Sequence, residues 1–284
     1  MSPSPPEAVP TPVRVDDTPT TQPILKIEAG QPPRHTTDEL AGEEPLEIRV
    51  RGQAVSVTMR TPHPDPHQRH QHDTELALGF LQGEGVIHSA ADVSAVEPCG
   101  RPANTHGNII NVFLAPHCDF DSAKLTRHVF ASSSCGLCGK ASIEAVHHHF
   151  DPIESTAQIS SHTLLSLPSK LRATQPTFDR TGGLHAAALF NARGDLLVVR
   201  EDIGRHNAVD NALGHALIQG WPPLDHHVLL VSGRASFEIM QKALSAQIAV
   251  VAAVSAPSSL AVEFSHESQQ TLVGFLRDGR MNVY

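Results

Sequence analysis

The feature that most constrains the fold is the succession of short apolar runs and short helical segments in the last third of the chain. Apolar runs at 228–231, 248–254 and 271–276 alternate with helical patterns at 237–244 and 260–264. Buried strands separated by short helices imply right-handed crossovers and a sheet covered on both faces. The sequence therefore predicts an α/β (α+β) protein with a mainly parallel or mixed sheet, whose ligands bind beyond the carboxyl ends of the strands.

Earlier segments predict further elements. Alternating apolar residues at 46–50 and 55–59 predict a β-hairpin around Gly52. A helix is expected from Asp73 or Thr74 to residue 81, followed by a strand at 109–114. Residues 186–190 and 196–200 predict a second hairpin, which a helix over 209–217 follows.

The length of 284 residues suits two domains. Residues 1–37 hold nine of the 22 prolines and predict a disordered, proline-rich tail. We expect a smaller N-terminal α/β domain at 38–130 and a C-terminal domain at 131–284. The histidine-rich segment 61–72 is either a metal site or a polar surface loop, and its irregular spacing favours the loop.

Charge and composition narrow the class of protein. A net charge of -9 disfavours a nucleic-acid binder. The first residues have no signal-peptide pattern, and the longest strongly apolar run, 248–254, is too short to cross a bilayer. We therefore expect a soluble, cytoplasmic protein, in which four cysteines serve chemistry, metal binding or packing rather than disulfides.

Two serine-rich loops follow the predicted strands at 228–231 and 248–254. The first contains Ser232, Gly233, Arg234 and Ser236, and the second contains Ser255, Ser258 and Ser259. Hydroxyls, backbone N–H groups and helix N-termini at such places accept phosphate. Serines in these positions are also common N-caps, so the pattern alone leaves anion binding and capping equally open.

The segment ASSSCGLCGK at 131–140 carries the most chemistry. Cys135 and Cys138 are each followed by glycine, which permits turns that aim N–H groups at one point and stabilise a thiolate. Half of a structural zinc site is one interpretation, although Cys99 and Cys118 form no second pair at this spacing. A redox dithiol and a cysteine that carries a sulfane sulfur are the others, and spacing does not separate them.

At this point the residues resemble a known family. The segments SSSCGLCGKASI, TGGLHAAALF, REDIGRHNAVDNALG, SGRASFEIMQKA, AVSAPSSLAVE and LVGFLRDGRMNVY are similar to those of the formate dehydrogenase accessory sulfurtransferases, labelled FdhD or NarQ. The similarity covers roughly residues 44–284. It implies a C-terminal domain like that of cytidine deaminases. No deaminase chemistry is expected, because the chain has no His-x-Glu motif and Ser134 precedes Cys135.

The resemblance implies a sulfurtransferase with no permanently bound metal. Members accept sulfur from a cysteine desulfurase and pass it to the bis(molybdopterin guanine dinucleotide) molybdenum cofactor, which formate dehydrogenase then uses. By motif, Cys135 matches the persulfide-bearing cysteine and Cys138 its partner. The stretch Phe275, Leu276, Arg277, Asp278, Gly279 and Arg280 matches the family's cofactor-binding segment, and the resemblance also implies a homodimer.

The sequence leaves some interpretations open. The polar segment 200–207 lines a cofactor cleft, forms a buried network, or does both, and we expect a mixed role. For His185 a satisfied core histidine is the safer expectation. The alternative functions are a cofactor chaperone without sulfur chemistry and a thiol–disulfide oxidoreductase.

Overall fold

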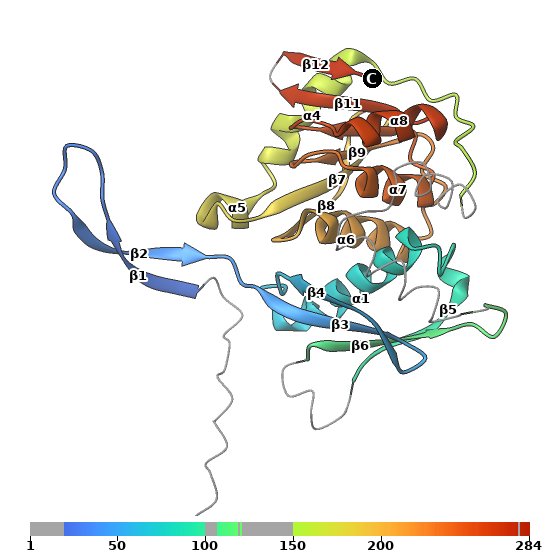
Figure 1. Ribbon diagram of the computed structural model, residues 1–284, viewed down its shortest axis with the longest axis horizontal. Coiled ribbons are helices and arrows are strands. Elements are labelled where there is room, and N and C mark those ends of the chain that lie inside the picture. The colour runs from blue at the N-terminus through green and yellow to red at the C-terminus, as the bar shows by residue number, and fades with distance from the viewer. Residues whose placement is uncertain (1–19, 100–106, 119, 121–149, 278) are drawn as a thin grey trace, which may run out of the picture.

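The computed structural model describes residues 20–99, 107–118, 120, 150–277 and 279–284. Cys135, Cys138 and Asp278 lie outside the described residues, as do residues 1–19 and the predicted domain boundary at 130/131. The division into the two predicted domains therefore stays a prediction. The described residues form three sheets of two, four and six strands with helices packed against them (Figure 1).

The four-stranded sheet belongs to the N-terminal part of the chain. Its order is β4-β3-β6-β5, and its strands span Glu44–Val50 (β3), Gln53–Arg60 (β4), Val93–Pro98 (β5) and Ile109–Leu114 (β6). Apolar and polar residues alternate along β3, which places the apolar side chains on one face of the strand. Leu46, Ile48 and Val50 on this face are fully buried. The predicted hairpin of β3 and β4 and the predicted strand β6 are confirmed.

Helix α1 starts earlier than its apolar pattern indicates. It spans Pro66–Gly83, with Asp65 as N-cap accepting a hydrogen bond from the His67 N–H. Proline at the first helical position has no N–H to leave unpaired, so Asp65-Pro66 is a favourable start. The predicted start at Asp73 or Thr74 is therefore wrong, and so is the prediction of a polar surface loop for residues 66–72. His72, within this stretch, is buried.

The six-stranded sheet has the order β12-β11-β10-β9-β7-β8. In chain order, this part of the protein consists of α4 (Ser161–Arg172), α5 (Pro176–Thr181), β7 (His185–Asn191), β8 (Leu196–Asp202), α6 (Arg205–Ile218), β9 (His227–Val231), α7 (Phe237–Ser245), β10 (Val250–Ala253), α8 (Ser259–Glu267), β11 (Thr271–Arg277) and β12 (Arg280–Val283). Only β9, β10 and β11 are parallel, so the sheet is mixed. The predicted β7–β8 hairpin and the alternation of strands and helices after it are confirmed.

Helices α6, α7 and α8 lie in a row along the six-stranded sheet, and α1 crosses α6 (Figure 1). The crossing depends on two glycines. A Cβ atom on Gly79 would lie 1.8 Å from the Asp210 carbonyl oxygen, and one on Gly214 would lie 1.8 Å from the Glu75 carbonyl oxygen. Real side chains never approach backbone this closely, so only glycine permits the contact between the two parts of the chain.

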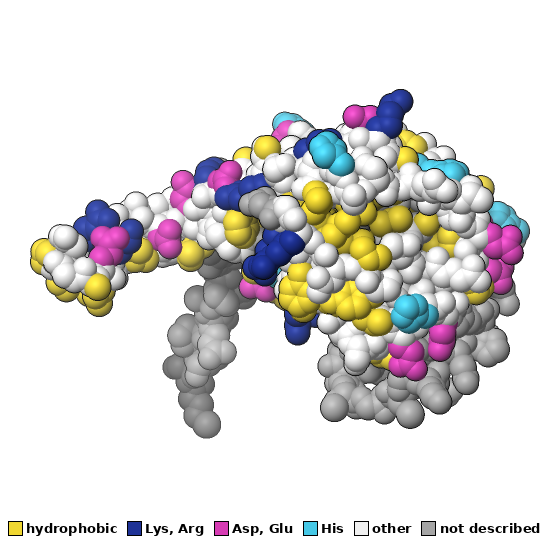
Figure 2. Space-filling view, turned by 90° about the horizontal axis from the view of Figure 1, so that it is seen from above, with side chains coloured by type: hydrophobic (Ala, Val, Ile, Leu, Met, Phe, Trp, Pro, Cys, Tyr) yellow, Lys and Arg dark blue, Asp and Glu magenta, His cyan; other side chains and the backbone are white. Residues whose placement is uncertain are grey.

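A two-stranded hairpin projects from the body of the protein (Figures 1 and 2). Strands β1 (Thr20–Lys26) and β2 (Arg34–Leu40) pair antiparallel. The prediction of a disordered tail is therefore wrong for residues 20–37. The proline content concealed the hairpin, but Pro23 stands in an outer strand, where a missing N–H is tolerated. Leu25, Ile27 and Leu40 are exposed on this arm.

Three short elements were not anticipated from the sequence: β5, α4 and α5. Strand β5 has no fully buried residue, and α4 contains Pro168, which interrupts the ordinary helical pattern. A single turn, η1, spans Ala90–Asp92. Among the described helices, none has the length and apolar character needed to cross a membrane.

Candidate anion-binding site

The two serine-rich loops lie side by side where the parallel strands end. Loop 232–236 follows β9 and loop 255–258 follows β10. The Ser255 N–H donates to the Gly233 carbonyl over 3.3 Å, and the Ser258 N–H donates to the Ala235 carbonyl over 3.0 Å. Residues Ala235 and Pro257 also form a parallel bridge. The predicted meeting of the two loops at one sheet edge is confirmed.

The serines in these loops have different roles. Ser258 caps α8, since its hydroxyl accepts from the Ala261 N–H at 3.2 Å. Ser232 fixes its loop to β7, because its hydroxyl accepts from the Ala186 N–H at 2.9 Å. Ser236 occupies the N-cap position of α7 without a capping hydrogen bond from its side chain. Its hydroxyl hydrogen-bonds the Glu238 carboxylate and lies 3.4 Å from the His206 Nε2 atom. Part of the set is thus structural, and Ser236 faces the site.

The start of α6 brings a cation to the same edge. Arg205 is the first residue of the helix, and Gly204 before it provides no side-chain cap. A Cβ atom on Gly233 would lie 3.7 Å from the Arg205 Cδ atom and 3.5 Å from the His185 Nδ1 atom. The Arg205 Nε atom is buried and has no hydrogen-bond partner among the described residues. An uncapped helix N-terminus beside a guanidinium with a spare donor is a favourable place for an anion.

His185 and His206, which lie beside the serine-rich loops, are uncharged at neutral pH. Burial, together with the nearby positive charges of Lys242 and Arg205, lowers the pKa of His206 to about 4. Burial also lowers the pKa of His185, with Arg205 adding to the shift. Both imidazoles therefore act as neutral hydrogen-bonding groups. His185 is half-buried at the edge of the sheet, so the expectation of a core histidine is wrong.

The end of β11 completes the edge. Phe275 has a left-handed backbone with φ of 53°, in an irregular stretch of the β11–β12 pairing, and its ring is exposed. Such a conformation is strained for a bulky residue and is retained where the surroundings impose it. The Phe275 N–H donates to the Ser255 carbonyl at 3.0 Å, and the Arg277 Nε atom donates to the Val254 carbonyl at 3.4 Å. These bonds hold the segment against the second serine loop.

The structure places most of the predicted binding residues along this one edge. They are Ser232, Arg234, Ser255, Phe275, Arg277, Gly279 and Arg280. Arg277 pairs with Arg280 across the β11–β12 turn, which Gly279 makes with φ of 75°. Leu276 differs from the prediction, because the residue is fully buried in the core.

The two halves of the polar segment 200–207 contact different parts of the protein. Its first half belongs to a network with the N-terminal part: Arg200 donates to the Glu75 carboxylate at 2.6 Å. The Asp202 carboxylate accepts from the N–H groups of Thr61 and Gly204 at 3.0 and 2.7 Å. The second half, Arg205 and His206, faces the serine loops. The buried-network part of the expected mixed role is confirmed. The sequence signal for the second half was the Gly-Arg-His start of a helix without a capping side chain.

One other group of side chains could hold a metal ion among the described residues. The ligand atoms of Asp92, His117 and Cys118 all lie within 4.8 Å of one another. His117 and Asp92 already form an ion pair at 3.0 Å, and the carboxylate also accepts from the His88 and Ser89 N–H groups. Asp92 directly precedes β5, and His117 and Cys118 follow β6, so the cluster belongs to the N-terminal part and not to the serine loops.

Comparison with known proteins places the chain in a family. The model of the FdhD/NarQ family matches residues 41–284. A protein named sulfur carrier protein FdhD in Mycolicibacterium paratuberculosis is 52% identical over 252 residues, which are 87% of this chain and 90% of the relative. A protein of the same name in Streptomyces avermitilis is 51% identical over 254 residues, covering 87% of each chain.

A solved structure has the same fold. The crystal structure of a candidate formate dehydrogenase accessory protein from Desulfotalea psychrophila superposes with a TM-score of 0.71. It covers 94% of this chain and 96% of its own, with 23% sequence identity. This likeness confirms the mixed α/β architecture, and the family match confirms the resemblance found in the motifs. The chain belongs to the FdhD/NarQ family.

Proposed function

We propose that this chain is a sulfur carrier that serves formate dehydrogenase by passing sulfur to its molybdenum cofactor. The observation that carries the proposal is the pair Cys135 and Cys138, each followed by glycine, within the matched residues 41–284. The relatives named above as sulfur carrier proteins support it, as does the name of the solved neighbour. The carboxyl ends of β9, β10 and β11 and the start of α6 form an anion-binding edge. This edge supports a cargo that bears phosphates.

Sulfur is loaded in the first step of the proposed mechanism. The Cys135 thiolate attacks the outer sulfur of a persulfide on a cysteine desulfurase. A sulfur–sulfur bond forms on Cys135 while the donor's sulfur–sulfur bond breaks, and the donor cysteine leaves as a thiolate. No net oxidation or reduction occurs, because one persulfide replaces another.

Sulfur is delivered in the second step. The Cys138 thiolate attacks the inner sulfur of the Cys135 persulfide, which forms a disulfide and releases hydrosulfide to the metal centre. The two cysteines supply the two electrons that convert sulfane sulfur to sulfide. A dithiol reductant of the thioredoxin class then regenerates the thiols.

The cargo is bis(molybdopterin guanine dinucleotide), and the edge offers suitable groups for its phosphates. Arg205, Arg277 and Arg280 supply cations, and the start of α6 supplies N–H groups. Phe275 offers an exposed aromatic face on which a base can stack. The described residues of this edge include no thiol, so its role in the proposal is to bind and orient the cargo.

The loading step is tested by incubating the chain with desulfurase and cysteine and measuring its intact mass. We expect wild type and Cys138→Ala to gain one sulfur atom and Cys135→Ala to gain none. Cys99→Ala and Cys118→Ala are matched controls and should load as wild type does. Sulfur retained on Cys135→Ala would refute the assignment. A cysteine-free chain that still binds and transfers active cofactor would instead indicate a chaperone.

Cargo binding is tested separately with guanosine diphosphate by calorimetry. Removing a charge-assisted hydrogen bond costs about 1.5–3 kcal/mol, or roughly a 10- to 150-fold loss of affinity. Arg277→Gln and Arg205→Gln should each show such a loss. Arg193→Gln in the β7–β8 turn is the control, because Arg193 pairs only locally with Asp195 in the described structure. The homodimer implied by the resemblance belongs to the same proposal, and light scattering tests it.

A further inference from the structure

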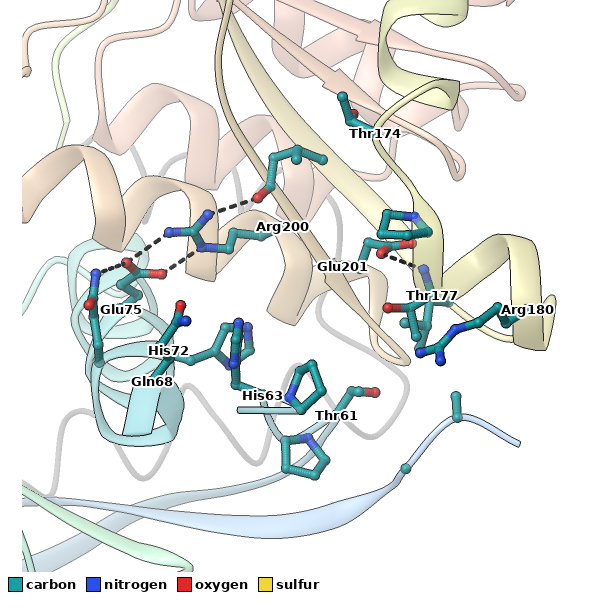
Figure 3. Close-up of a pocket in the computed structure, with 18 of the residues that line it drawn as sticks. Thr61, His63, Gln68, His72, Glu75, Thr174, Thr177, Arg180, Arg200 and Glu201 are labelled. Atoms are coloured by element: carbon teal, nitrogen blue, oxygen red, sulfur yellow. Dashed lines mark hydrogen bonds and ion pairs between the residues drawn. The ribbon is translucent and has the colours of Figure 1, made fainter. Parts of the chain in front are cut away.

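A cavity of about 330 Å³, whose walls include no residue of the serine loops, lies where the N-terminal and C-terminal parts of the chain meet (Figure 3). Its walls come from α1, from the segment before α1, from α5 and from the end of β8. β8 is the edge strand of the six-stranded sheet, whereas the serine loops follow β9 and β10 inside it. The volume is in the range of small-molecule sites.

The cavity contains an unpaired buried polar group. His72 is only 7% exposed, and its Nδ1 atom has no hydrogen-bond partner among the described residues. Its ring lies beside that of His63, with ring centroids 5.7 Å apart (Figure 3). Buried polar atoms in native proteins are nearly always hydrogen-bonded, so an orphan that lines a cavity indicates a missing partner.

The charged groups of the cavity are already paired. Glu75 accepts from Arg200 at 2.6 Å and lies 2.9 Å from the His215 Nδ1 atom. Glu201 accepts from the Thr177 and Phe178 N–H groups at the start of α5. Arg180 lies half-exposed with Glu39 at 3.6 Å. With its carboxylates compensated, the cavity favours an uncharged ligand.

The polar groups left over indicate the ligand's chemistry. One amide N–H of Gln68 donates to Asp65 and one of Gln71 donates to Glu75, so each side chain keeps its carbonyl oxygen and a second N–H for a ligand. Such oxygens accept hydrogen bonds from amino groups. The apolar part of the wall consists mainly of flat or branched side chains: Pro62, Pro64, Pro176, Leu184 and Val199. A planar ring can lie against these side chains while its polar edge meets the amides and His72.

We propose that this cavity binds an uncharged, planar nitrogen heterocycle with an amino group, of the nucleobase class. The His72 ring supplies one hydrogen bond to the edge of the heterocycle, and the carbonyl oxygens of Gln68 and Gln71 accept from its amino group. The base belongs either to a free nucleoside or to a larger nucleotide. The site is separate from the anion-binding edge and does not depend on the proposed sulfur chemistry.

The test titrates the full chain with adenosine, guanosine, cytidine and uridine, using saturation-transfer NMR and calorimetry. We expect at least one amino-bearing nucleoside to bind, and uridine, which has no amino group, to bind about tenfold more weakly. His72→Phe keeps the ring's shape and removes the nitrogen, and Ala41→Met fills part of the cavity. Each should weaken binding at least tenfold, whereas His162→Phe, on the exposed face of α4, should not.

Two controls identify the site and the source of the ligand. The monophosphate of the best nucleoside is titrated with and without inorganic phosphate. Equal affinity for nucleoside and nucleotide, without competition by phosphate, supports a base-only site. Binding that requires the phosphate, or that survives both His72→Phe and Ala41→Met, overturns the proposal, as does failure of every nucleoside to bind. If His72→Phe does not fold, Ala41→Met decides. Persulfide loading of Cys135 should be unchanged in both variants, which keeps this test independent of the sulfur-carrier test.

Discussion

A buried ion pair joins α6 and α7, the two helices whose first residues lie at the anion-binding edge. Lys242 Nζ lies 2.7 Å from Asp210 Oδ1, and the two side chains are 8% and 4% exposed. The ammonium also lies 5.6 Å from the centre of the Phe80 ring in α1. Because α6 begins at Arg205 and α7 begins directly after Ser236, this pair fixes the separation of two groups that face the site.

We predict that Lys242→Met destabilises the protein by about 3–5 kcal/mol at pH 8, because it leaves a buried carboxylate without its partner. That is a large part of the 5–15 kcal/mol typical of folded domains. Asp210→Asn should cost a similar amount by leaving the ammonium unpaired. The double variant has neither charge, so its cost should be roughly 2–3 kcal/mol less than the sum of the two. Lys26→Met, in the exposed pair with Glu28, is the control and should cost under about 1 kcal/mol.

The assay is equilibrium unfolding in urea followed by circular dichroism, repeated at pH 5 and pH 8. Burial raises the pKa of Asp210 to about 6 even with Lys242 present to oppose the shift. Without Lys242 that pKa rises further above its unfolded value, so the carboxyl is neutral at pH 5 and charged only at higher pH. The cost of Lys242→Met should therefore shrink at pH 5. A cost below about 1 kcal/mol at pH 8, or strictly additive single variants, would refute the reasoning.

Three further outcomes follow from particular contacts. Gly79→Ala should destabilise the protein by about 1–3 kcal/mol or more, measured by urea unfolding, because its Cβ would lie 1.8 Å from the Asp210 carbonyl oxygen; an unchanged midpoint would contradict the α1–α6 crossing. Burial raises the pKa of Asp202 to about 6, so its contribution to stability is full below pH 4 and is lost as the pH rises through 6. Asp202→Asn should remove up to about 3 kcal/mol of this pH dependence of the free energy of unfolding. Identical stability–pH profiles for wild type and Asp202→Asn would count against the raised pKa. Phe275→Gly should relieve the left-handed backbone, raising the melting temperature or leaving it unchanged, while it weakens guanosine diphosphate binding; tighter binding would argue against a stacking role.

Much of the C-terminal sheet could be predicted from the sequence because its signals are local. The apolar run at 228–231 and the two apolar runs joined by the turn at Gly194 identify strands by local pattern and turn chemistry alone. The hairpin of β1 and β2 could not be predicted in this way. Its strands contain Pro23 and mostly polar residues, and nearly all of its side chains are exposed. Pairing between the two strands, rather than burial of an apolar face, defines this hairpin, and such pairing leaves no periodic pattern.

The candidate site was predictable to the extent that topology determines it. Parallel strands place their following loops at one edge, so Ser232 and Ser255 had to approach each other. Arg205 and His185 reach the same edge only because β7 and β8 extend the sheet antiparallel, with β7 next to β9. That order is set by tertiary packing, which the motifs around His185 and Arg205 do not report. Leu276 is the opposite case. It belongs to the segment 275–280 that matches the family's cofactor-binding stretch, but its side chain faces the core.

The chemistry of the two sites differs because the protein uses its histidines in an uncharged form. With 19 histidines, the net charge of -9 could move markedly toward neutral on mild acidification. Yet burial lowers the pKa of His72 to about 3 and that of His206 to about 4. Positive charge at the anion-binding edge therefore comes from arginines and from the start of α6, which stay positive throughout the physiological range. In the cavity a neutral His72 beside paired carboxylates has no charge to offer, so hydrogen-bonding geometry selects the ligand. One edge is thus suited to phosphate and the cavity to an uncharged ring, although both lie along the same mixed sheet.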